Sequence, residues 1–247
     1  MVKTAEEIMQ IRIACRICRE ILLELGRRIG EGLTTGELEE QAACLMKERG
    51  VRSAFKGYRG YPGILCISIN EEVVHGIPSP RRKICSGDLV SVDIGVVYKG
   101  YYGDCADTFL VGEVSPARKL LVAAAHQALE AGIGKAVPGN RVGDISRAIQ
   151  ETVEKFGFSV VRDFSGHGIG RSLHEPPEVP NFGVAGHGHL LEENMVLAIE
   201  PMVNEGSWAV QILSDGWTAV TADRSCSAHV EDTVLVRNDR AEILTAI

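Results

Sequence analysis

Two aspartates, Asp93 and Asp104, stand eleven positions apart in a segment with the pattern of a β-hairpin. β-Branched and aromatic residues fill both arms, and Lys99-Gly100 supplies a two-residue turn in which glycine accepts a positive φ. A turn at this place pairs Gly95 with Asp104 across the hairpin. Residues two apart share a face of a strand, so Asp93 and Asp104 are predicted to be diagonal neighbours on one face.

Two carboxylates held this close repel each other unless a proton or a cation lies between them. A divalent metal ion is the natural bridge, because hard cations prefer carboxylate oxygens. The alternative is an ordinary polar hairpin face in contact with water. The apolar residues that flank both aspartates argue against that alternative.

Three distant segments each offer one more metal-competent side chain. His167 lies between glycines in Gly166–Gly170, Glu200 ends an apolar run just before Pro201, and Glu231 lies in the apolar stretch 228–236. Alternation in that last stretch puts Glu231 on the face that carries His229. Each alone is better explained as a solvated charge or a loop residue, and the glycines around His167 are only a weak dinucleotide-binding pattern, since no Rossmann context surrounds them.

Taken together, the candidates form a ligand set of four carboxylates and one imidazole: Asp93, Asp104, His167, Glu200 and Glu231. Oxygen ligands with one nitrogen suit two divalent first-row ions, and the sequence does not distinguish between Co, Mn, Fe and Zn. Paired ions about 3.5–4 Å apart are typical of hydrolases that activate water. The set therefore indicates a metallohydrolase.

Composition limits the alternatives. The chain has 247 residues, 45% hydrophobic and 24% charged, which is ordinary for a globular protein. A net charge of −7 makes a general nucleic-acid binder improbable. Seven scattered cysteines suit free thiols in a reducing cytosol. We expect a cytoplasmic protein, because no signal peptide or membrane-length apolar run is present.

Periodicity predicts mixed α and β elements that must position these residues. Helices are expected over 4–26, 35–50, 115–134 and 142–156, and strands over 64–69, 90–98, 101–109 and 158–161, with further strands from 196 onward. The segments 55–63, 70–80 and 165–181 are expected to be loops, since glycine and proline recur in them. Each half of the chain carries helices and an acid-bearing strand pair, which hints at a duplicated layout.

With these residues in place, the sequence resembles a methionine aminopeptidase of the bacterial type I form over nearly its whole length. The motifs that carry the resemblance are Tyr58–Pro62 with Cys66–Glu71, His75–Pro78, the Asp93/Asp104 pair, Gly166–Gly170 with His174-Glu175 and Pro177, Ile199–Pro201, and Ser227–Glu231. The resemblance implies an α+β "pita-bread" fold. In that fold, two pseudo-symmetric halves pack helices on a central curved antiparallel sheet, and residues 1–247 form a single catalytic domain.

The resemblance also implies an activity: metal-dependent removal of the initiator methionine from nascent polypeptide N-termini, with a small second residue preferred, by attack of a metal-bridging hydroxide. Glu200 is then general base and proton shuttle as well as a ligand. His75 and His174 bind the substrate amide and steady the tetrahedral intermediate. The methionine pocket falls to Tyr58, Tyr61, Cys66 and Trp217, and an apolar, partly aromatic pocket suits a thioether.

Three positions depart from the family pattern. Phe55 stands where many bacterial members have cysteine, and Leu173 where they have phenylalanine, so the selectivity of the pocket can shift. Asp232 follows Glu231 where histidine is usual, and alternation predicts that it faces the other side of its strand.

Two other functions share features with this sequence. A prolidase or aminopeptidase P shares the fold, but is expected to bring a separate N-terminal domain and to lack the Tyr58–Asn70 motif. A catalytically dead pita-bread protein that binds a peptide would have lost ligands, and here all five are kept. The expected protein is a monomer without a nucleic-acid or membrane partner. Ribosome association is implied only through the nascent-chain substrate.

Overall fold

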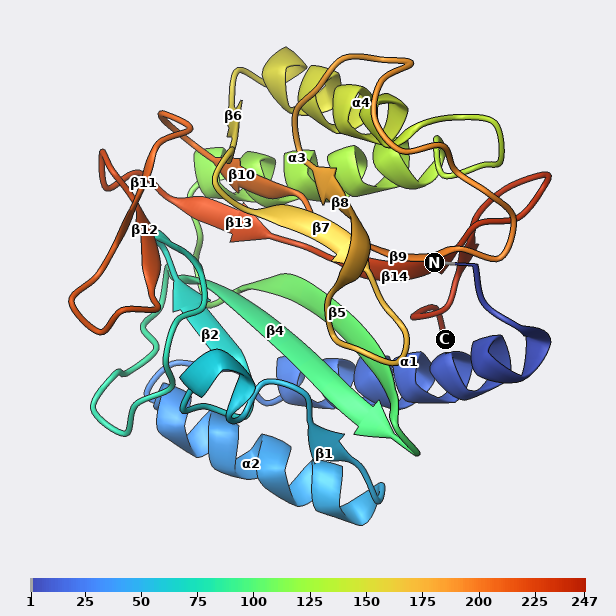
Figure 1. Ribbon diagram of the computed structural model, residues 1–247. Coiled ribbons are helices and arrows are strands. Elements are labelled where there is room, and N and C mark those ends of the chain that lie inside the picture. The colour runs from blue at the N-terminus through green and yellow to red at the C-terminus, as the bar shows by residue number, and fades with distance from the viewer. Residues whose placement is uncertain (1) are drawn as a thin grey trace.

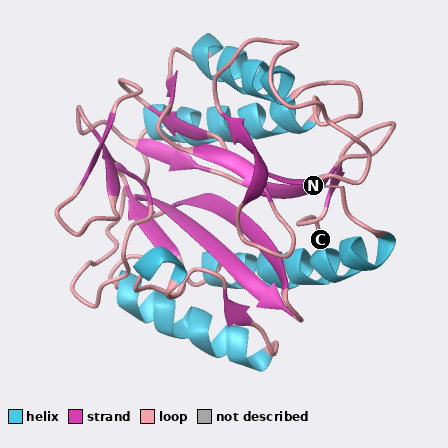
Figure 2. Cartoon of the chain, viewed as in Figure 1, coloured by secondary structure: helices cyan, strands magenta, loops and turns pink. Residues whose placement is uncertain are grey.

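The computed structural model describes residues 2–247, in which two pairs of helices are each followed by a series of antiparallel strands (Figures 1 and 2). The helices are α1 (Ala5–Gly26), α2 (Thr35–Glu48), the 3-10 turn η1 (Tyr58–Gly60), α3 (Pro116–Ile133) and α4 (Val142–Lys155). The strands are β1 (Arg52–Ser53), β2 (Cys66–Ile69), β3 (Glu72–Val74), β4 (Leu89–Tyr98), β5 (Tyr101–Leu110), β6 (Ser159–Val160), β7 (Ser165–Gly168), β8 (Glu175–Pro180), β9 (Val196–Ile199), β10 (Met202–Asn204), β11 (Val210–Ile212), β12 (Ala219–Thr221), β13 (Ser227–His229), β14 (Asp232–Leu235) and β15 (Glu242–Ile243). The predicted α+β class is confirmed.

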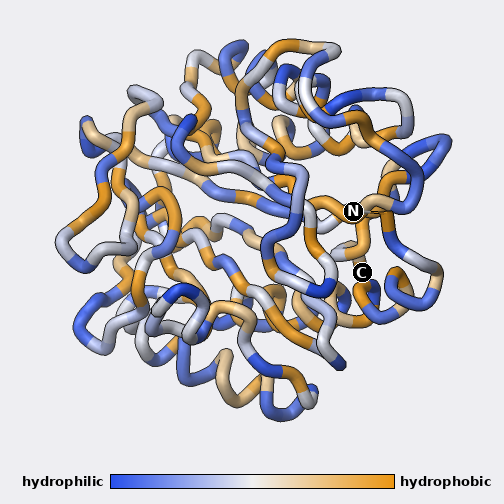
Figure 3. Tube along the Cα trace, in the orientation of Figure 1, coloured by the Kyte–Doolittle hydropathy of each residue, from blue (hydrophilic) through white to orange (hydrophobic). Residues whose placement is uncertain are grey.

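The helices begin where their capping residues predict. Thr4 caps α1 in a reciprocal capping box with Glu7, which satisfies two backbone N–H groups that the helix leaves free. The equivalent box at α2 uses Thr34 and Glu37, and the helix begins at Thr35 as predicted. In Figure 3 hydrophobic and hydrophilic residues alternate along the helices, as expected for helices with one buried face.

The helices cover the sheets in two pairs. Helix α1 lies against the β4–β5 hairpin, with α2 beside it next to β1. Helices α3 and α4 lie on the opposite side of the molecule, where they contact β6, β8, β10 and β13 (Figure 1). Each pair closes a separate apolar cluster over its own strands. The duplicated layout expected from the sequence is therefore visible as two helix-backed halves, with strands between them.

The hairpin has the predicted register. Tyr98 pairs with Tyr101 around the Lys99-Gly100 turn, and Gly95 pairs with Asp104. Lys99 and Gly100 both have positive φ, as a two-residue hairpin turn of this kind requires. Asp93 and Asp104 therefore lie on the same face of the sheet.

Two segments that were predicted to be loops contain strands. β3 lies within 70–80, and β7 and β8 lie within 165–181. The glycines misled the prediction, because they serve close packing: a Cβ at Gly166 would lie 2.4 Å from the carbonyl oxygen of Ala198. The prolines of β8 are tolerated since β8 is the outermost strand of its sheet.

The predicted continuous strand over 228–236 is also wrong, because it breaks at Val230-Glu231. β13 pairs with β10, whereas β14 pairs with β9, so the chain passes from one sheet to another. The run 196–203 breaks at Glu200-Pro201, between β9 and β10, in agreement with the expectation that this apolar run ends at Glu200 before the proline. Both breaks place a glutamate outside the regular ladder.

A seam joins the hairpin to the C-terminal strands, and much of it consists of side-chain hydrogen bonds. Ala106 forms an isolated antiparallel bridge with Glu231. The Thr108 hydroxyl donates to the carbonyl oxygen of His229 at 2.8 Å, and the Thr233 hydroxyl donates to that of Asp104 at 2.7 Å. The seam thus brings the Asp104 and Glu231 segments together from opposite halves of the chain.

One further expectation is confirmed for the described residues. All seven cysteines are free thiols. Among residues 2–247, no helix combines the length and the apolar character that crossing a bilayer requires.

Gly103 lets β5 approach α1, because a Cβ there would lie 2.5 Å from the backbone nitrogen of Cys15. We expect Gly103→Ala to lower the free energy of unfolding by about 1–3 kcal/mol, since backbone must move to admit the methyl group. Urea denaturation of the two proteins measures the difference. Gly30→Ala is the matched control, because that glycine has open space around it; equal losses in both variants would contradict this reading of the contact.

Candidate metal centre and its cavity

Residues from three separate strand regions meet at the seam. Ligand-type atoms of Asp104, His167 and Glu231 all lie within 4.8 Å of one another, and all three residues are buried. His167 Nε2 is 3.9 Å from Asp104 Oδ2 and 3.6 Å from Glu200 Oε1. Asp93 and Glu200 line the same cavity as Asp104 and His167. All five residues predicted as ligands therefore gather at one place.

Secondary structure explains how each side chain reaches this place. The register of β4 with β5 turns Asp93 and Asp104 to one face. His167 extends from β7, which pairs with β9 immediately before Glu200. The strand breaks release Glu200 and Glu231 from their ladders, and the backbone N–H of Glu231 is held by the Ala106 carbonyl oxygen at 3.0 Å.

The acids lack the hydrogen-bond donors that buried carboxylates normally have. Among the described residues, Asp93 Oδ1, Asp104 Oδ1 and Glu231 Oε1 are buried oxygens without a partner. Burial raises the pKa of Asp93 to about 7, and burial with the neighbouring acids raises the pKa of Asp104 and Glu231 well above the usual range. Orphaned, closely spaced oxygens around one imidazole fit divalent cations.

Two residues at the site were not identified as functional from the sequence. His229 Nε2 lies 3.5 Å from Glu200 Oε2, and the neighbouring acids raise the pKa of this histidine although burial opposes them. The Asn181 side-chain amide donates to the backbone carbonyl oxygen of Glu200 at 3.1 Å. The position of His229, two residues before Glu231, was a signal for the first; no sequence signal marked Asn181.

A cavity of about 690 Å³ opens from the acids toward an apolar wall. All six residues predicted to bind substrate line it, and Phe55 and Leu173 do so as well: the six are Tyr58, Tyr61, Cys66, His75, His174 and Trp217. Tyr61 packs edge-on against Trp217 with 5.1 Å between ring centroids, and its hydroxyl donates to the carbonyl oxygen of Gly76 at 3.0 Å. These contacts fix the shape of the apolar wall.

The two histidines of the cavity are held differently. The His174 ring lies 4.1 Å from the His167 ring between centroids, and His174 Nδ1 is 2.7 Å from the Tyr58 hydroxyl oxygen. Burial, together with the nearby His167, lowers the pKa of His174 to about 4. His75 has a positive φ of 61° and packs edge-on against Phe164, and burial lowers its pKa. Both rings are therefore neutral near pH 7.

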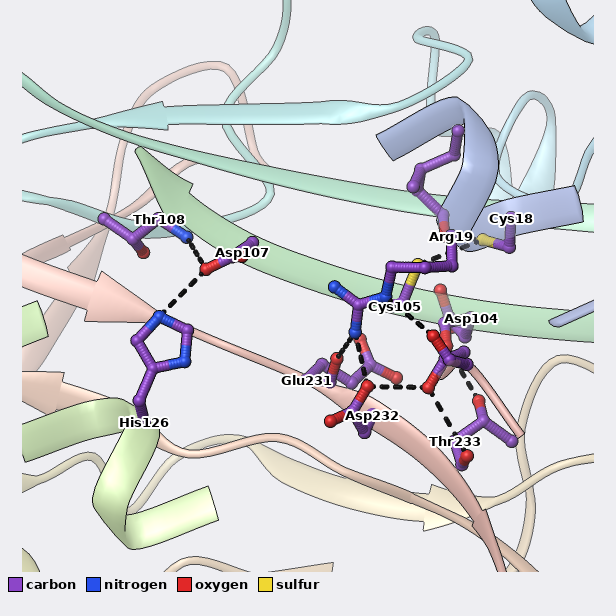
Figure 4. Close-up of polar contacts among 12 residues, drawn as sticks. Cys18, Arg19, Asp104, Cys105, Asp107, Thr108, His126, Glu231, Asp232 and Thr233 are labelled. Carbon is purple, nitrogen blue, oxygen red and sulfur yellow. Dashed lines mark hydrogen bonds and ion pairs between the residues drawn. The ribbon is translucent and has the colours of Figure 1, made fainter. Parts of the chain in front are cut away.

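Asp232 faces away from the cluster, as alternation predicted. Its carboxylate pairs with Arg19 of α1 (Figure 4). It also accepts a hydrogen bond from the Thr245 hydroxyl at 2.6 Å. It is therefore not a sixth ligand.

Comparison with known proteins agrees with this geometry. Residues 9–238 match the model of metallopeptidase family M24. A methionine aminopeptidase of Clostridium acetobutylicum is 47% identical over 245 residues, which cover 99% of this chain and 98% of the relative. The crystal structure of methionine aminopeptidase from Thermotoga maritima superposes with a TM-score of 0.98 at 47% identity, covering 100% of this chain and 99% of that one.

A prolidase from Pyrococcus furiosus shares the fold more distantly. Its TM-score is 0.82 at 26% identity, and the match covers 100% of this chain but 65% of the prolidase. The pita-bread architecture is therefore confirmed, and full-length similarity lies with the methionine aminopeptidases. The chain belongs to metallopeptidase family M24 and, within it, to the methionine aminopeptidases.

Proposed function

We propose that this protein is a metal-dependent aminopeptidase that removes the initiator methionine from the N-termini of newly made polypeptides, with a small second residue preferred. One observation carries the proposal: the cavity joins a cluster of orphaned buried carboxylates to an apolar aromatic pocket. A cavity of this kind fits an amino terminus at one end and a thioether side chain at the other.

Two divalent ions are proposed for the centre, held by Asp93, Asp104, His167, Glu200 and Glu231. Four carboxylates match the charge of two such ions, and the lone imidazole is a ligand that Co, Mn, Fe and Zn all accept. When bound, the ions polarise the scissile carbonyl and lower the pKa of water.

The pocket residues position the substrate. Tyr58, Tyr61, Cys66 and Trp217 offer an apolar, partly aromatic surface to the methionine side chain, and a thioether gains from such contacts. The α-amine of the substrate is then directed toward Asp93. Phe55 and Leu173 narrow the same wall, which makes them the positions where side-chain selectivity is set.

Glu200 is proposed to transfer protons, and His75 and His174 to donate hydrogen bonds to the reacting amide. The Glu200 carboxylate lies between His167 and His229, so it can take a proton from the attacking water and pass it to the leaving amine. The neutral rings of His75 and His174 can donate N–H groups to the amide and to the oxygen of the tetrahedral intermediate. The Tyr58 hydroxyl occupies His174 Nδ1, which leaves Nε2 for the substrate.

The remaining expectations follow from this function. We expect residues 1–247 to act as one catalytic unit, as a cytoplasmic monomer whose partners are polypeptide N-termini and, through them, the ribosome. Size-exclusion chromatography with light scattering tests the monomer.

Substrate choice separates the three functions considered. Purified protein supplied with Mn²⁺ or Co²⁺ is expected to release methionine from Met-Ala-Ser and to leave Ala-Pro-Pro intact, because the pocket suits a thioether. Chromatography of the products measures both reactions. Cleavage of Ala-Pro-Pro alone would favour a prolidase-type enzyme, and peptide binding without cleavage under any metal would favour a binding protein.

Glu200→Gln is expected to lower kcat for Met-Ala-Ser by roughly 10²-fold or more, because the proton shuttle is lost. The circular dichroism spectrum should not change. Glu113→Gln is the matched control, since Glu113 is exposed and lies outside the cavity lining. Wild-type turnover in Glu200→Gln would refute the assigned role.

Asp104→Asn is expected to separate stability from metal binding. In EDTA at pH 8 the variant should unfold at the same or a higher urea concentration than wild type, because one of several repelling buried charges is gone. With Mn²⁺ at about 100 times its Kd, wild type should gain about 2.7 kcal/mol and the variant much less. Exposed Asp239 supplies the control variant, Asp239→Asn, and an equal Mn²⁺ gain in Asp104→Asn would exclude Asp104 as a ligand.

A further inference from the structure

Arg19, on the buried side of α1, contacts Glu231 and Asp232. Its side chain is 14% exposed, and its guanidinium pairs with Asp232, whose side chain is 15% exposed (Figure 4). Arg19 Nη2, the nitrogen that contacts the Asp232 carboxylate, also donates to the carbonyl oxygen of Glu231 at 3.3 Å. Arg19 Nε donates to the carbonyl oxygen of Thr245 at 2.9 Å. The planar guanidinium thus contacts two consecutive residues, Glu231 and Asp232, together with Thr245 near the C-terminus.

Glu231 needs such support because it lies in the break between β13 and β14. Its backbone is held by the isolated bridge to Ala106, in which the return hydrogen bond, from the Ala106 N–H to the Glu231 carbonyl oxygen, is long at 3.4 Å. The Arg19 guanidinium supplies the second donor to that carbonyl oxygen. Side chains alternate here, so the Glu231 carboxylate points into the cluster while the Asp232 carboxylate points to α1.

The chemistry of the pair suits positioning more than stability. A buried ion pair often adds little net stability, since desolvation of both charges offsets their attraction. The N–H groups of a guanidinium have a fixed, planar geometry, so each hydrogen bond that the group donates restricts the position of one acceptor. Thr245 adds a further constraint, because its hydroxyl donates to Asp232 at 2.6 Å and orients the carboxylate.

We propose that Arg19 and Asp232 are positioning residues of the metal centre, which fix the backbone of Glu231 so that its carboxylate meets Asp104 and His167. The inference rests on the metal centre proposed above. It assigns a role to Asp232, the departure from the family pattern that lies next to a ligand but does not reach the cluster.

Co²⁺ is the probe for the test, because its visible absorption reports ligand geometry independently of turnover. Metal-free wild type, Asp232→Asn, Arg19→Ala and the double variant are titrated with Co²⁺ by calorimetry and absorption spectroscopy. We expect both single variants to bind Co²⁺ roughly tenfold more weakly or worse, with an altered spectrum, as loss of groups that orient ligands usually does. The double variant should be little worse than either single variant, because the two side chains act together.

Arg12→Ala is the matched control. Arg12 lies on the same helix and also pairs with the C-terminal region, through Glu242. The side chains of this pair are 42% and 37% exposed, and among the described residues neither forms a hydrogen bond or ion pair with Glu231 or Asp232. Its Co²⁺ affinity should stay within about twofold of wild type. With saturating Co²⁺, Asp232→Asn should lower kcat for Met-Ala-Ser and leave KM nearly unchanged, because the methionine pocket is not altered.

Each result bears on the inference. Wild-type Co²⁺ affinity and spectrum in Asp232→Asn would overturn it, even if the variant melts at a lower temperature. If Arg19→Ala does not fold, Asp232→Asn decides, since asparagine keeps the volume and an acceptor for Thr245. Failure of wild type to bind Co²⁺ would refute the metal centre and this inference together, whereas binding by wild type and variants alike would refute the inference alone.

Discussion

Negative charge is concentrated at the seam, and the fold has to oppose the repulsion between these carboxylates. Several carboxylates with raised pKa values share one buried place, and within residues 2–247 three of their oxygens have no hydrogen-bond donor. Such an arrangement costs folding free energy unless cations compensate it. The two helix-backed halves, the glycine contact of β5 with α1 and the hydrogen bonds of Thr108 and Thr233 hold the acids together against this repulsion.

The hairpin could be predicted in detail because its information is local. Alternation and one turn determine the register, and the register determines that Asp93 and Asp104 share a face. Helix starts were similarly accessible through Thr4 and Ser115, each of which accepts a hydrogen bond at its cap. For the ligand set, chemistry selected the residues, and resemblance to a family supplied roles that spacing alone could not.

The errors arose where tertiary packing overrides local pattern. Gly166 looked like a loop residue, yet it lies within strand β7. The position holds a glycine because the Ala198 carbonyl oxygen leaves no room for a side chain. The run around Glu231 looked like one strand, yet it divides because its two parts pair with different partners. Asn181 and Arg19 carried no recognisable signal, since what they do depends on backbone groups brought to them from remote segments.

The composition of the seam has a consequence for the protein in the cell. At the seam itself, the hairpin and the C-terminal strands meet through the Ala106–Glu231 bridge and the hydroxyls of Thr108 and Thr233, with the acids directly beside these contacts. Bound cations would then hold the two strand regions together at the seam. Their loss would leave the repulsion between the carboxylates to be opposed by the other contacts between the halves, such as the β3–β12 pairing and the Arg19–Asp232 ion pair. Loss of the ion would therefore shorten the lifetime of the polypeptide as well as lower its catalytic activity, because a chain that opens more often is exposed more often to proteases.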